Sequence, residues 1–194
     1  MKKKTFVLLL ALVLIAGAAV GGTLAWLTDT TDAVQNTFTT SNIEIELDES
    51  DNLDLKMIPG WTITKDPKVT VIAGSEKCYL FVKIEKSSNF DNFMTYTVAA
   101  DWTPLNDTNN DGVADDGVYY RVVEASDADQ EFAVLKDNQV TVKVTVTKAD
   151  MEALKAANAT LPTLTFTAYA TQYMSSNEGN FTPADAWTNV QPTT

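Results

Sequence analysis

The sequence predicts an all-β fold, a jelly-roll-like antiparallel two-sheet sandwich with a short crossover helix. Seven stretches alternate apolar and polar residues with a period of two, and Val, Ile, Thr and Tyr are frequent in them. Clusters rich in Gly, Pro, Asn and Asp separate the stretches and are typical of turns. With 194 residues, 45% of them hydrophobic, the chain is long enough to form one substantial core.

The expected strands follow one another along the chain, and period-two alternation places one face of each on the core. They cover residues 43–47, 69–71, 78–85, 94–98, 118–123, 140–147 and 163–171. The third strand is the clearest, because Cys78, Leu80 and Val82 form one face while Lys83 lies on the other. The pattern therefore predicts that the lone cysteine, Cys78, has a buried thiol.

Two stretches break the period of two and predict helices. Residues 148–158 carry Met151 and Leu154 among several alanines, so we expect about three helical turns, capped by Thr147 or Asp150. This helix would cross between the last two long strands. Residues 183–187 predict one short helical turn.

Residues 1–25 predict a signal peptide helix. Lysines at positions 2–4 precede an apolar run over residues 6–20, and small residues follow it. A retained transmembrane anchor is the alternative, but a spanning helix needs about 20 apolar residues. We expect cleavage between Ala25 and Trp26. The protein would then touch the membrane only transiently and become secreted, in an extracellular matrix or at the cell surface.

Composition excludes several classes of function. The 26 acidic and 14 basic residues give a net charge of −12, which repels nucleic-acid phosphates. Histidine is absent, so Ser-His-Asp and Cys-His catalysis and His-ligated zinc are excluded. Cys78 is the one cysteine, and it cannot form an internal disulfide. We therefore expect a protein that is not an enzyme.

One acidic loop has the pattern of a calcium ligand set. Asp107, Asn109 and Asp111 place side-chain oxygens at alternate positions before Gly112, and Asp115 can supply a later ligand. The twelfth position lacks the bidentate Glu, and no helices are expected on either side, so the loop is not an EF-hand. Calcium is thus a possible cofactor. The alternative is a turn that uses the same residues for backbone reasons.

A series of short motifs runs through nearly the whole chain. They are Gly22-Thr-Leu-Ala25-Trp-Leu-Thr28-Asp29, Asn36-Thr-Phe38-Thr, Ile43-Glu-Ile-Glu-Leu47, Ile58-Pro59-Gly60, Tyr79-Leu-Phe-Val82-Lys83-Ile84, Gly117-Val-Tyr119-Tyr120, Ala168-Tyr-Ala170-Thr-Gln172-Tyr173 and Pro183-Ala-Asp-Ala186-Trp187. Their order resembles the TasA/camelysin family, which are exported proteins of Gram-positive bacteria. The resemblance implies a SipW-type signal peptidase as a partner, a jelly-roll domain and a role in biofilm matrix fibres.

The resemblance also implies assembly by donor-strand exchange, in which a freed N-terminal segment completes the sheet of the next subunit. Residues 26–35 would be this donor or leader segment, because Trp26, Leu27 and Val34 are apolar and Thr28 favours extension. The partner would then be the chain itself, in a head-to-tail homopolymer. Some family members are described as metallopeptidases, but a chain without histidine does not support that activity.

The sequence therefore divides into a signal peptide (1–25), a donor segment (26–35) and a β-sandwich domain (36–194). Our first hypothesis is a secreted structural protein, a subunit of extracellular matrix fibres. The alternative is a monomeric cell-surface module that binds a glycan or a host ligand. Aromatic rings such as Trp61 and Trp102 are most simply core and rim residues, but a carbohydrate-binding platform would also use such rings. A peptidase would need a metal–base constellation that these residues do not provide.

Overall fold

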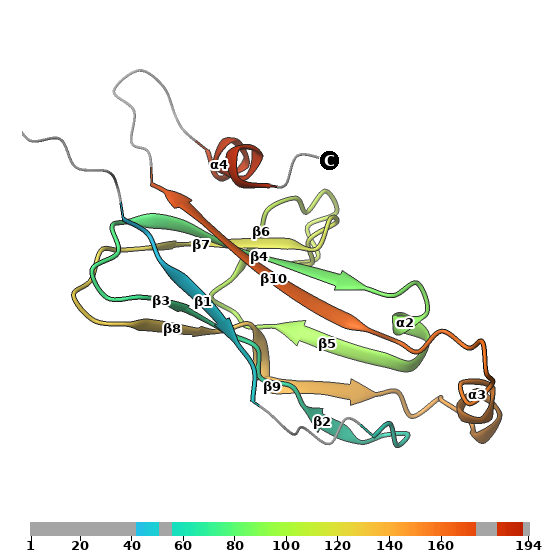
Figure 1. Cartoon of the computed structure of the whole chain (residues 1–194). Helices are drawn as coiled ribbons and strands as arrows, with labels where there is room; N and C mark the ends of the chain where they lie inside the picture. Colours follow the sequence, from blue (N-terminus) through green and yellow to red (C-terminus); the bar gives the residue numbers. More distant parts are fainter. Residues whose placement is uncertain (1–41, 51–55, 174–181, 192–194) are drawn as a thin grey trace, which may run out of the picture. The chain divides into compact units, whose positions relative to one another are not determined.

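The computed structural model describes residues 42–50, 56–173 and 182–191, all of them within the compact unit Thr40–Thr194 (Figure 1). The signal peptide, the cleavage site and the donor segment lie outside the described residues. The described strands are β1 (Ile45–Asp48), β2 (Thr62–Thr64), β3 (Lys68–Val71), β4 (Cys78–Lys86), β5 (Met94–Val98), β6 (Thr103–Pro104), β7 (Val118–Val123), β8 (Gln130–Ala133), β9 (Leu135–Val142) and β10 (Leu164–Gln172). The helices are α2 (Phe90–Phe93), α3 (Lys148–Ala153) and α4 (Pro183–Val190).

The prediction of an all-β sandwich is confirmed, and every strand pair in the described part is antiparallel. One layer is a four-stranded sheet with the order β10-β4-β7-β6. The other layer contains two three-stranded sheets, β1-β3-β8 and β2-β9-β5 (Figure 1). Hydrogen bonds therefore define three sheets, where the sequence led us to expect two.

The break between the two smaller sheets lies at Pro67. The β2–β9 pair and the β3–β8 pair have registers that differ by two residues, although β2 leads into β3 and β8 leads into β9. Proline has no backbone N–H for the ladder, and here the N–H of Val134 donates to Pro67 O at 2.9 Å. The two small sheets are thus two halves of one interrupted layer.

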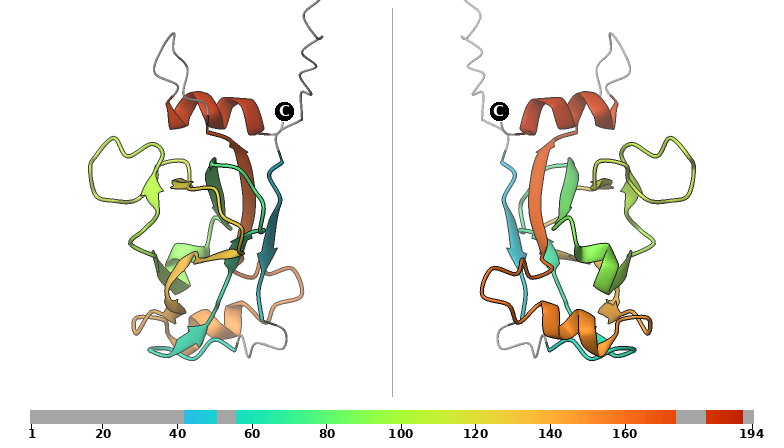
Figure 2. Two further views of the ribbon diagram at one scale, coloured as in Figure 1. Left: turned by 90° about the vertical axis from the view of Figure 1, so that its left-hand side faces the viewer. Right: turned by 90° about the vertical axis from the view of Figure 1, so that its right-hand side faces the viewer.

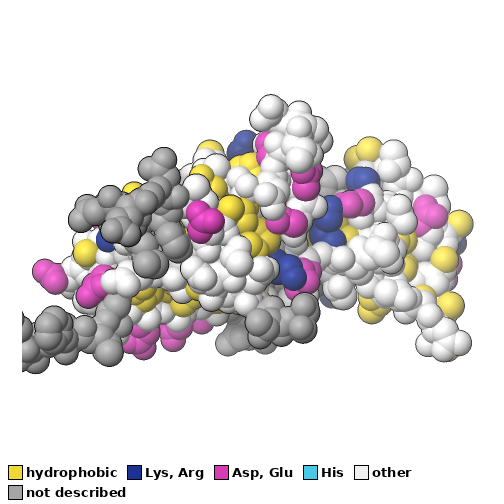
Figure 3. Space-filling view, turned by 90° about the horizontal axis from the view of Figure 1, so that it is seen from above, with side chains coloured by type: hydrophobic (Ala, Val, Ile, Leu, Met, Phe, Trp, Pro, Cys, Tyr) yellow, Lys and Arg dark blue, Asp and Glu magenta, His cyan; other side chains and the backbone are white. Residues whose placement is uncertain are grey.

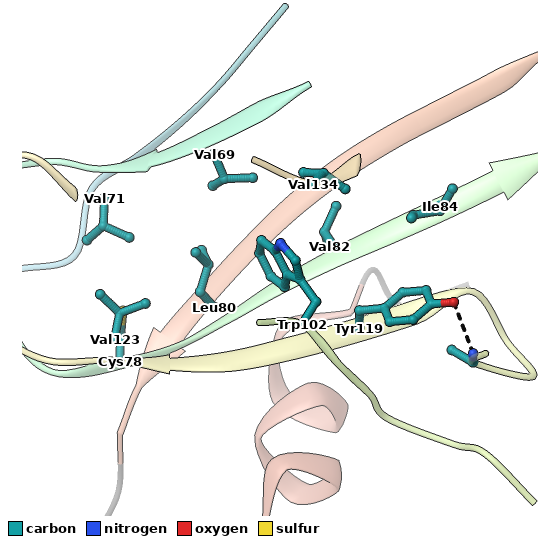
Figure 4. Close-up of a cluster of buried hydrophobic side chains, with 11 residues drawn as sticks. Val69, Val71, Cys78, Leu80, Val82, Ile84, Trp102, Tyr119, Val123 and Val134 are labelled. Carbon is teal, nitrogen blue, oxygen red and sulfur yellow. Dashed lines mark hydrogen bonds between the residues drawn. The ribbon is translucent and has the colours of Figure 1, made fainter. Parts of the chain in front are cut away.

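The main core lies between the layers, and β4 contributes the predicted apolar face to it. The side chains that meet there are Val69, Val71, Cys78, Leu80, Val82, Ile84, Trp102, Tyr119, Val123 and Val134 (Figure 4). The opposite face of β4 is also buried, because Tyr79 and Phe81 pack in a second cluster with Ala186 of α4. The central strand is therefore covered on both faces, by the second layer and by α4.

The helices differ in length from the sequence prediction. Thr147 caps α3 and forms a capping box with Asp150, as expected, but α3 ends at Ala153. α4 has eight residues, with its own capping box between Thr182 and Asp185. The sequence analysis missed α2 and the short strands β2, β6 and β8.

Candidate assembly site

β10 is an edge strand, and within the described residues it hydrogen bonds to β4 alone. The N–H of Tyr173 donates to Lys77 O at 3.0 Å, and the N–H of Ser87 donates to Thr163 O at 3.1 Å. Because bonded and non-bonded pairs alternate in an antiparallel ladder, the odd-numbered residues of β10 bond to β4. The even-numbered residues of Leu164–Gln172 therefore point their backbone N–H and C=O groups away from β4.

β1 is the edge strand of the neighbouring sheet and pairs with β3. The N–H of Ile72 donates to Glu44 O at 2.9 Å, which fixes the bonded positions of this ladder on even-numbered residues of β1. The backbone groups of Ile45 and Leu47 therefore point away from β3.

β1 and β10 lie side by side at one margin of the sandwich (Figures 1 and 2). We call the gap between these two strands the seam. No backbone hydrogen bond between described residues crosses the seam. Some Cα atoms of β1 and β10 lie within 8 Å of each other, whereas a strand placed between them would need about 9.6 Å. An added strand can therefore pair with the edge of β10 only if β1 moves aside.

Two clefts adjoin the seam near the start of β10, the first mainly apolar and the second lined by both apolar and charged side chains. The inner cleft has a volume of about 270 Å³, and its main walls are Met57, Ile63, Phe90, Met94, Val140 and Leu164. The edge cleft, of about 300 Å³, is lined chiefly by Leu47, Glu49, Lys65, Pro67, Leu164 and Phe166. Lys65 and Leu164 line both clefts, so the clefts adjoin one another. The inner cleft offers space for apolar side chains of an added strand.

Lys65 lies where the two clefts meet. Its ammonium contacts the two carboxylate oxygens of Glu49 at 2.5 and 2.6 Å and lies 5.4 Å from the ring centroid of Phe166. The side chain of Lys65 is 16% exposed, whereas that of Glu49 is 33% exposed. The lysine stem is therefore held between apolar walls, while its partner reaches water.

A second contact holds the end of β1 beside Lys65. The hydroxyl and the N–H of Ser50 donate to the Asp66 carboxylate at 2.5 and 3.1 Å. These bonds, led by the hydroxyl, hold the pKa of Asp66 below its usual value. The segment after β1 is thus fastened across the edge cleft by Glu49 and Ser50.

The acidic loop between β6 and β7 uses its predicted calcium ligands to bind its own backbone. Asp107 accepts from the N–H groups of Asp111 and Gly112 at 3.1 and 2.9 Å. Asn109 Oδ1 also accepts from the N–H of Asp111 at 3.2 Å, and Asp111 accepts from the N–H of Val113 at 2.8 Å. The structure therefore brings Asp107, Asn109 and Asp111 together at one tip.

The fourth predicted ligand, Asp115, bonds to a different part of the loop. It accepts from the hydroxyl and the N–H of Thr108 at 2.7 and 3.0 Å, and these bonds lower its pKa. Left-handed backbone at Asn110 and Gly112 suits the residue types found there. Among the described residues, no group of three His, Cys, Asp or Glu side chains is placed to hold a metal ion. Calcium binding stays a prediction.

A third cleft, of about 550 Å³, opens on the other margin, between β5 and the acidic loop. Its walls include Lys86, Asp91, Tyr96, Trp102, Asp111 and Tyr119. Rings and charges of both signs are typical of a site for a polar ligand.

The other residues that the sequence singled out are accounted for by packing or exposure. Cys78 is fully buried, and burial raises the pKa of its thiol to about 11, so it is not a nucleophile. Trp102 is buried, and its indole N–H donates to Ala133 O at 2.9 Å. Trp61 is 62% exposed.

Sequence reasoning did not find the clefts at the seam. Lys65 and Phe166 lie 101 positions apart, and neither has a motif around it. The register of β10 on β4 and the irregular segment 65–67 between β2 and β3 bring these two side chains together.

None of the described helices is long and apolar enough to span a membrane.

No family model, curated protein or solved structure matches the chain. What can be said of function therefore depends on the seam, its clefts and the sequence motifs.

Proposed function

We propose that the mature chain is a secreted structural subunit that polymerises head to tail. In this proposal, β1 of the next copy moves aside, and residues 26–35 of one copy pair with the β10 edge that it leaves. The observation that carries the proposal is the edge of β10, whose even-numbered residues point backbone groups into a seam that no described hydrogen bond crosses.

The position of the two ends of the seam supports a head-to-tail contact. The N–H of Glu76 donates to Asn42 O at 3.0 Å, and the amide of Gln172 bonds to Glu76 at 3.3 Å. Asn42 therefore lies at the Gln172 end of the seam, whereas the clefts lie at the Leu164 end. A segment that precedes Asn42 leaves one end of the seam, and the apolar space opens at the other. A heterologous contact that does not close on itself builds a filament.

Length also fits. β10 has nine residues, which span about 30 Å at roughly 3.3 Å per residue. The ten residues 26–35 reach about 33 Å when extended, so they can cover the whole edge. The resemblance to the TasA/camelysin family supports a place for these filaments in a biofilm matrix, after cleavage by a SipW-type signal peptidase.

Deletion of residues 26–35 from the mature chain tests this proposal. The intact mature chain should form filaments in electron micrographs, and light scattering should grow with concentration. The deletion variant should stay monomeric while its circular dichroism remains that of a β-rich fold. Filaments from the deletion variant at the same concentration would contradict donor-strand assembly.

A matched pair of point variants sharpens the test. Thr30→Pro removes one backbone N–H from the donor segment and should stop its pairing with β10. Thr30→Val keeps the N–H and the preference for extended structure, so it should assemble like the unchanged chain.

The 550 Å³ cleft favours a second candidate function, a monomeric module that binds a polar ligand such as a glycan. This function predicts a chain that stays monomeric at all concentrations and binds one ligand class saturably. Lys86→Ala would then lower ligand affinity without changing the oligomeric state. A glycan array and analytical ultracentrifugation on the same sample distinguish the two functions.

A further inference from the structure

The inner cleft is an apolar space between two small core clusters. Ile63 belongs to one cluster, Phe90 and Val140 belong to the other, and all three line the cleft while being more than nine-tenths buried. Met94 packs on both clusters, and Met57 packs on the first. The unbranched side chains of these two methionines can adjust to the shape of a bound molecule. The interior of the cleft is therefore suited to an aliphatic chain.

Lys65 supplies a positive charge at this apolar space. Among the described residues that line the inner cleft, it is the one charged side chain. Its ammonium accepts a partner from outside, because Glu49 lines the edge cleft and bonds to it at 2.5 and 2.6 Å. The cleft thus combines apolar walls with a single cation, an arrangement that orients a ligand with an apolar body and one anionic group.

We propose that the inner cleft binds an aliphatic monocarboxylate, with the chain inside the cleft and the carboxylate bonded to Lys65. At the packing density of protein interiors, about 0.75, the 270 Å³ of the cleft hold about 200 Å³ of ligand, roughly an acid of eight to ten carbons. Such binding needs neither a filament nor a donor segment, so the inference goes beyond the proposed function.

Glu49 is the partner that the ligand replaces. Its side chain is 33% exposed, against 16% for Lys65, so it can turn into water, where an ion pair contributes little. A ligand carboxylate then makes the charge-assisted hydrogen bond to Lys65 in its place. An alkylammonium of the same length brings a like charge to Lys65, and an alcohol brings no charge. The site should therefore prefer the acid to both.

A series of unbranched acids tests the fit of the chain. Isothermal titration calorimetry of the intact mature chain with butanoate, hexanoate, octanoate, decanoate and dodecanoate should show saturable one-to-one binding. Each buried methylene contributes about 0.8 kcal/mol, which lowers Kd about fourfold per carbon. The gain should stop near decanoate, when the cleft is full.

Head groups and point variants test the role of Lys65. Octanoate should bind at least about tenfold more tightly than octan-1-ol or octylamine. Lys65→Met keeps an apolar stem and should remove this preference, whereas Glu49→Gln frees the ammonium and should tighten octanoate binding. Lys83→Met is the matched control, because it breaks the ion pair with Glu85 on β4, and it should leave the affinity unchanged. Thermal melting confirms that each variant is folded.

Four results would overturn the inference. They are octanoate binding that does not saturate, a gain per carbon that continues undiminished through dodecanoate, binding of octylamine as tight as that of octanoate, and an unchanged affinity for octanoate in Lys65→Met. Weaker octanoate binding in Glu49→Gln would equally show that the ligand does not replace Glu49. Filament growth is not a readout of these measurements, so their failure leaves the proposed function standing.

Discussion

The phenolic oxygen of Tyr119 accepts a hydrogen bond from the backbone N–H of Ala114 at 3.1 Å, and both residues are buried (Figure 4). The bond joins the acidic loop to β7 in the main core. Burial raises the pKa of the Tyr119 phenol, so the group stays protonated at neutral pH. The conformation of the acidic loop is therefore tied to the packing of the sandwich.

Removal of the phenolic oxygen of Tyr119 should destabilise the folded state. Tyr119→Phe leaves the N–H of Ala114 buried without its partner, so we expect the free energy of unfolding to fall by about 1–3 kcal/mol. Urea unfolding followed by circular dichroism measures the change. Tyr169→Phe, which removes an oxygen from a partly buried ring beside α4, serves as the control and should cost less. Equal losses would contradict a special role for the Tyr119 bond.

Gly117 should tolerate no side chain. Its φ is +73°, and a Cβ there would lie 2.3 Å from the carbonyl oxygen of Ile84. Gly117→Ala should therefore lower the free energy of unfolding by roughly 3 kcal/mol or more, through backbone strain and a clash with β4. Gly74→Ala has the same strain, with φ +81°, but meets no atom within 4 Å. The control should lose only about 1 kcal/mol, and similar losses at the two glycines would contradict the clash.

The cap of α4 should make its attachment depend on pH. The hydroxyl and the backbone N–H of Thr182 hold the pKa of Asp185 below its ordinary value of 3.8. A lowered pKa in the folded state stabilises the helix above the ordinary value, and this contribution is lost as the pH falls through the lowered pKa. We expect α4 to loosen below about pH 4 and Asp185→Asn to remove this dependence.

Trp187 reports the loosening of α4. Its ring packs on Phe81 at 5.3 Å and on Tyr169 at 5.1 Å between centroids, so its fluorescence should change when α4 leaves the sheet. The difference between the unchanged chain and Trp187→Phe isolates this signal. Asp150→Asn removes the equivalent cap residue of α3 and should leave the Trp187 titration unchanged. A titration that is also unchanged in Asp185→Asn would contradict the assignment.

Calcium binding by the acidic loop can be tested directly. A bound ion at a hundredfold excess over its Kd stabilises the folded state by about 2.7 kcal/mol, so EDTA should lower the melting temperature and Asp111→Ala should abolish the difference. Identical melting curves with EDTA and with millimolar calcium would mean that the loop is a turn held by its own Asx hydrogen bonds.

Export can be tested at the predicted cleavage site. Intact mass of the secreted protein should show Trp26 as the first residue. Ala25→Arg should block cleavage, because a large cation does not enter a pocket for small residues, and the chain should stay associated with the membrane. Secreted protein that retains Met1 would contradict the signal peptide.

The sequence predicted the long strands well because alternation is a local signal. β4 and β10 both carry it over many residues, and both were found in place. The predicted strand over 140–147 was shifted, since β9 begins at Leu135 and ends at Val142, and Val144 is 81% exposed. The apolar residues that follow Val142 lie in a turn and in a small cluster with Met151. Alternation of apolar and polar residues does not by itself distinguish such a segment from a strand.

The division into sheets and the clefts could not be predicted in the same way. β2, β6 and β8 have only two to four residues, too few for a period to show. The outer face of β4 has a mixed sequence pattern, and it is buried because α4 and tyrosines of neighbouring segments pack against it. This is the side of the molecule that faces the viewer in Figure 3. Lys65 lies between the clefts because segments that are distant in the sequence pack together there. No sequence pattern around residue 65 could therefore predict this position.

The pairing of β4 with β10 also governs when the domain can fold. Cys78 at the start of β4 lies opposite Gln172 at the end of β10, so the central sheet stays incomplete until almost the whole chain has been synthesised. Pairings between such distant residues form slowly, because a large loop must close before they contribute. A chain that cannot finish its central sheet early remains unfolded until β10 has been synthesised, which would suit the export that we propose.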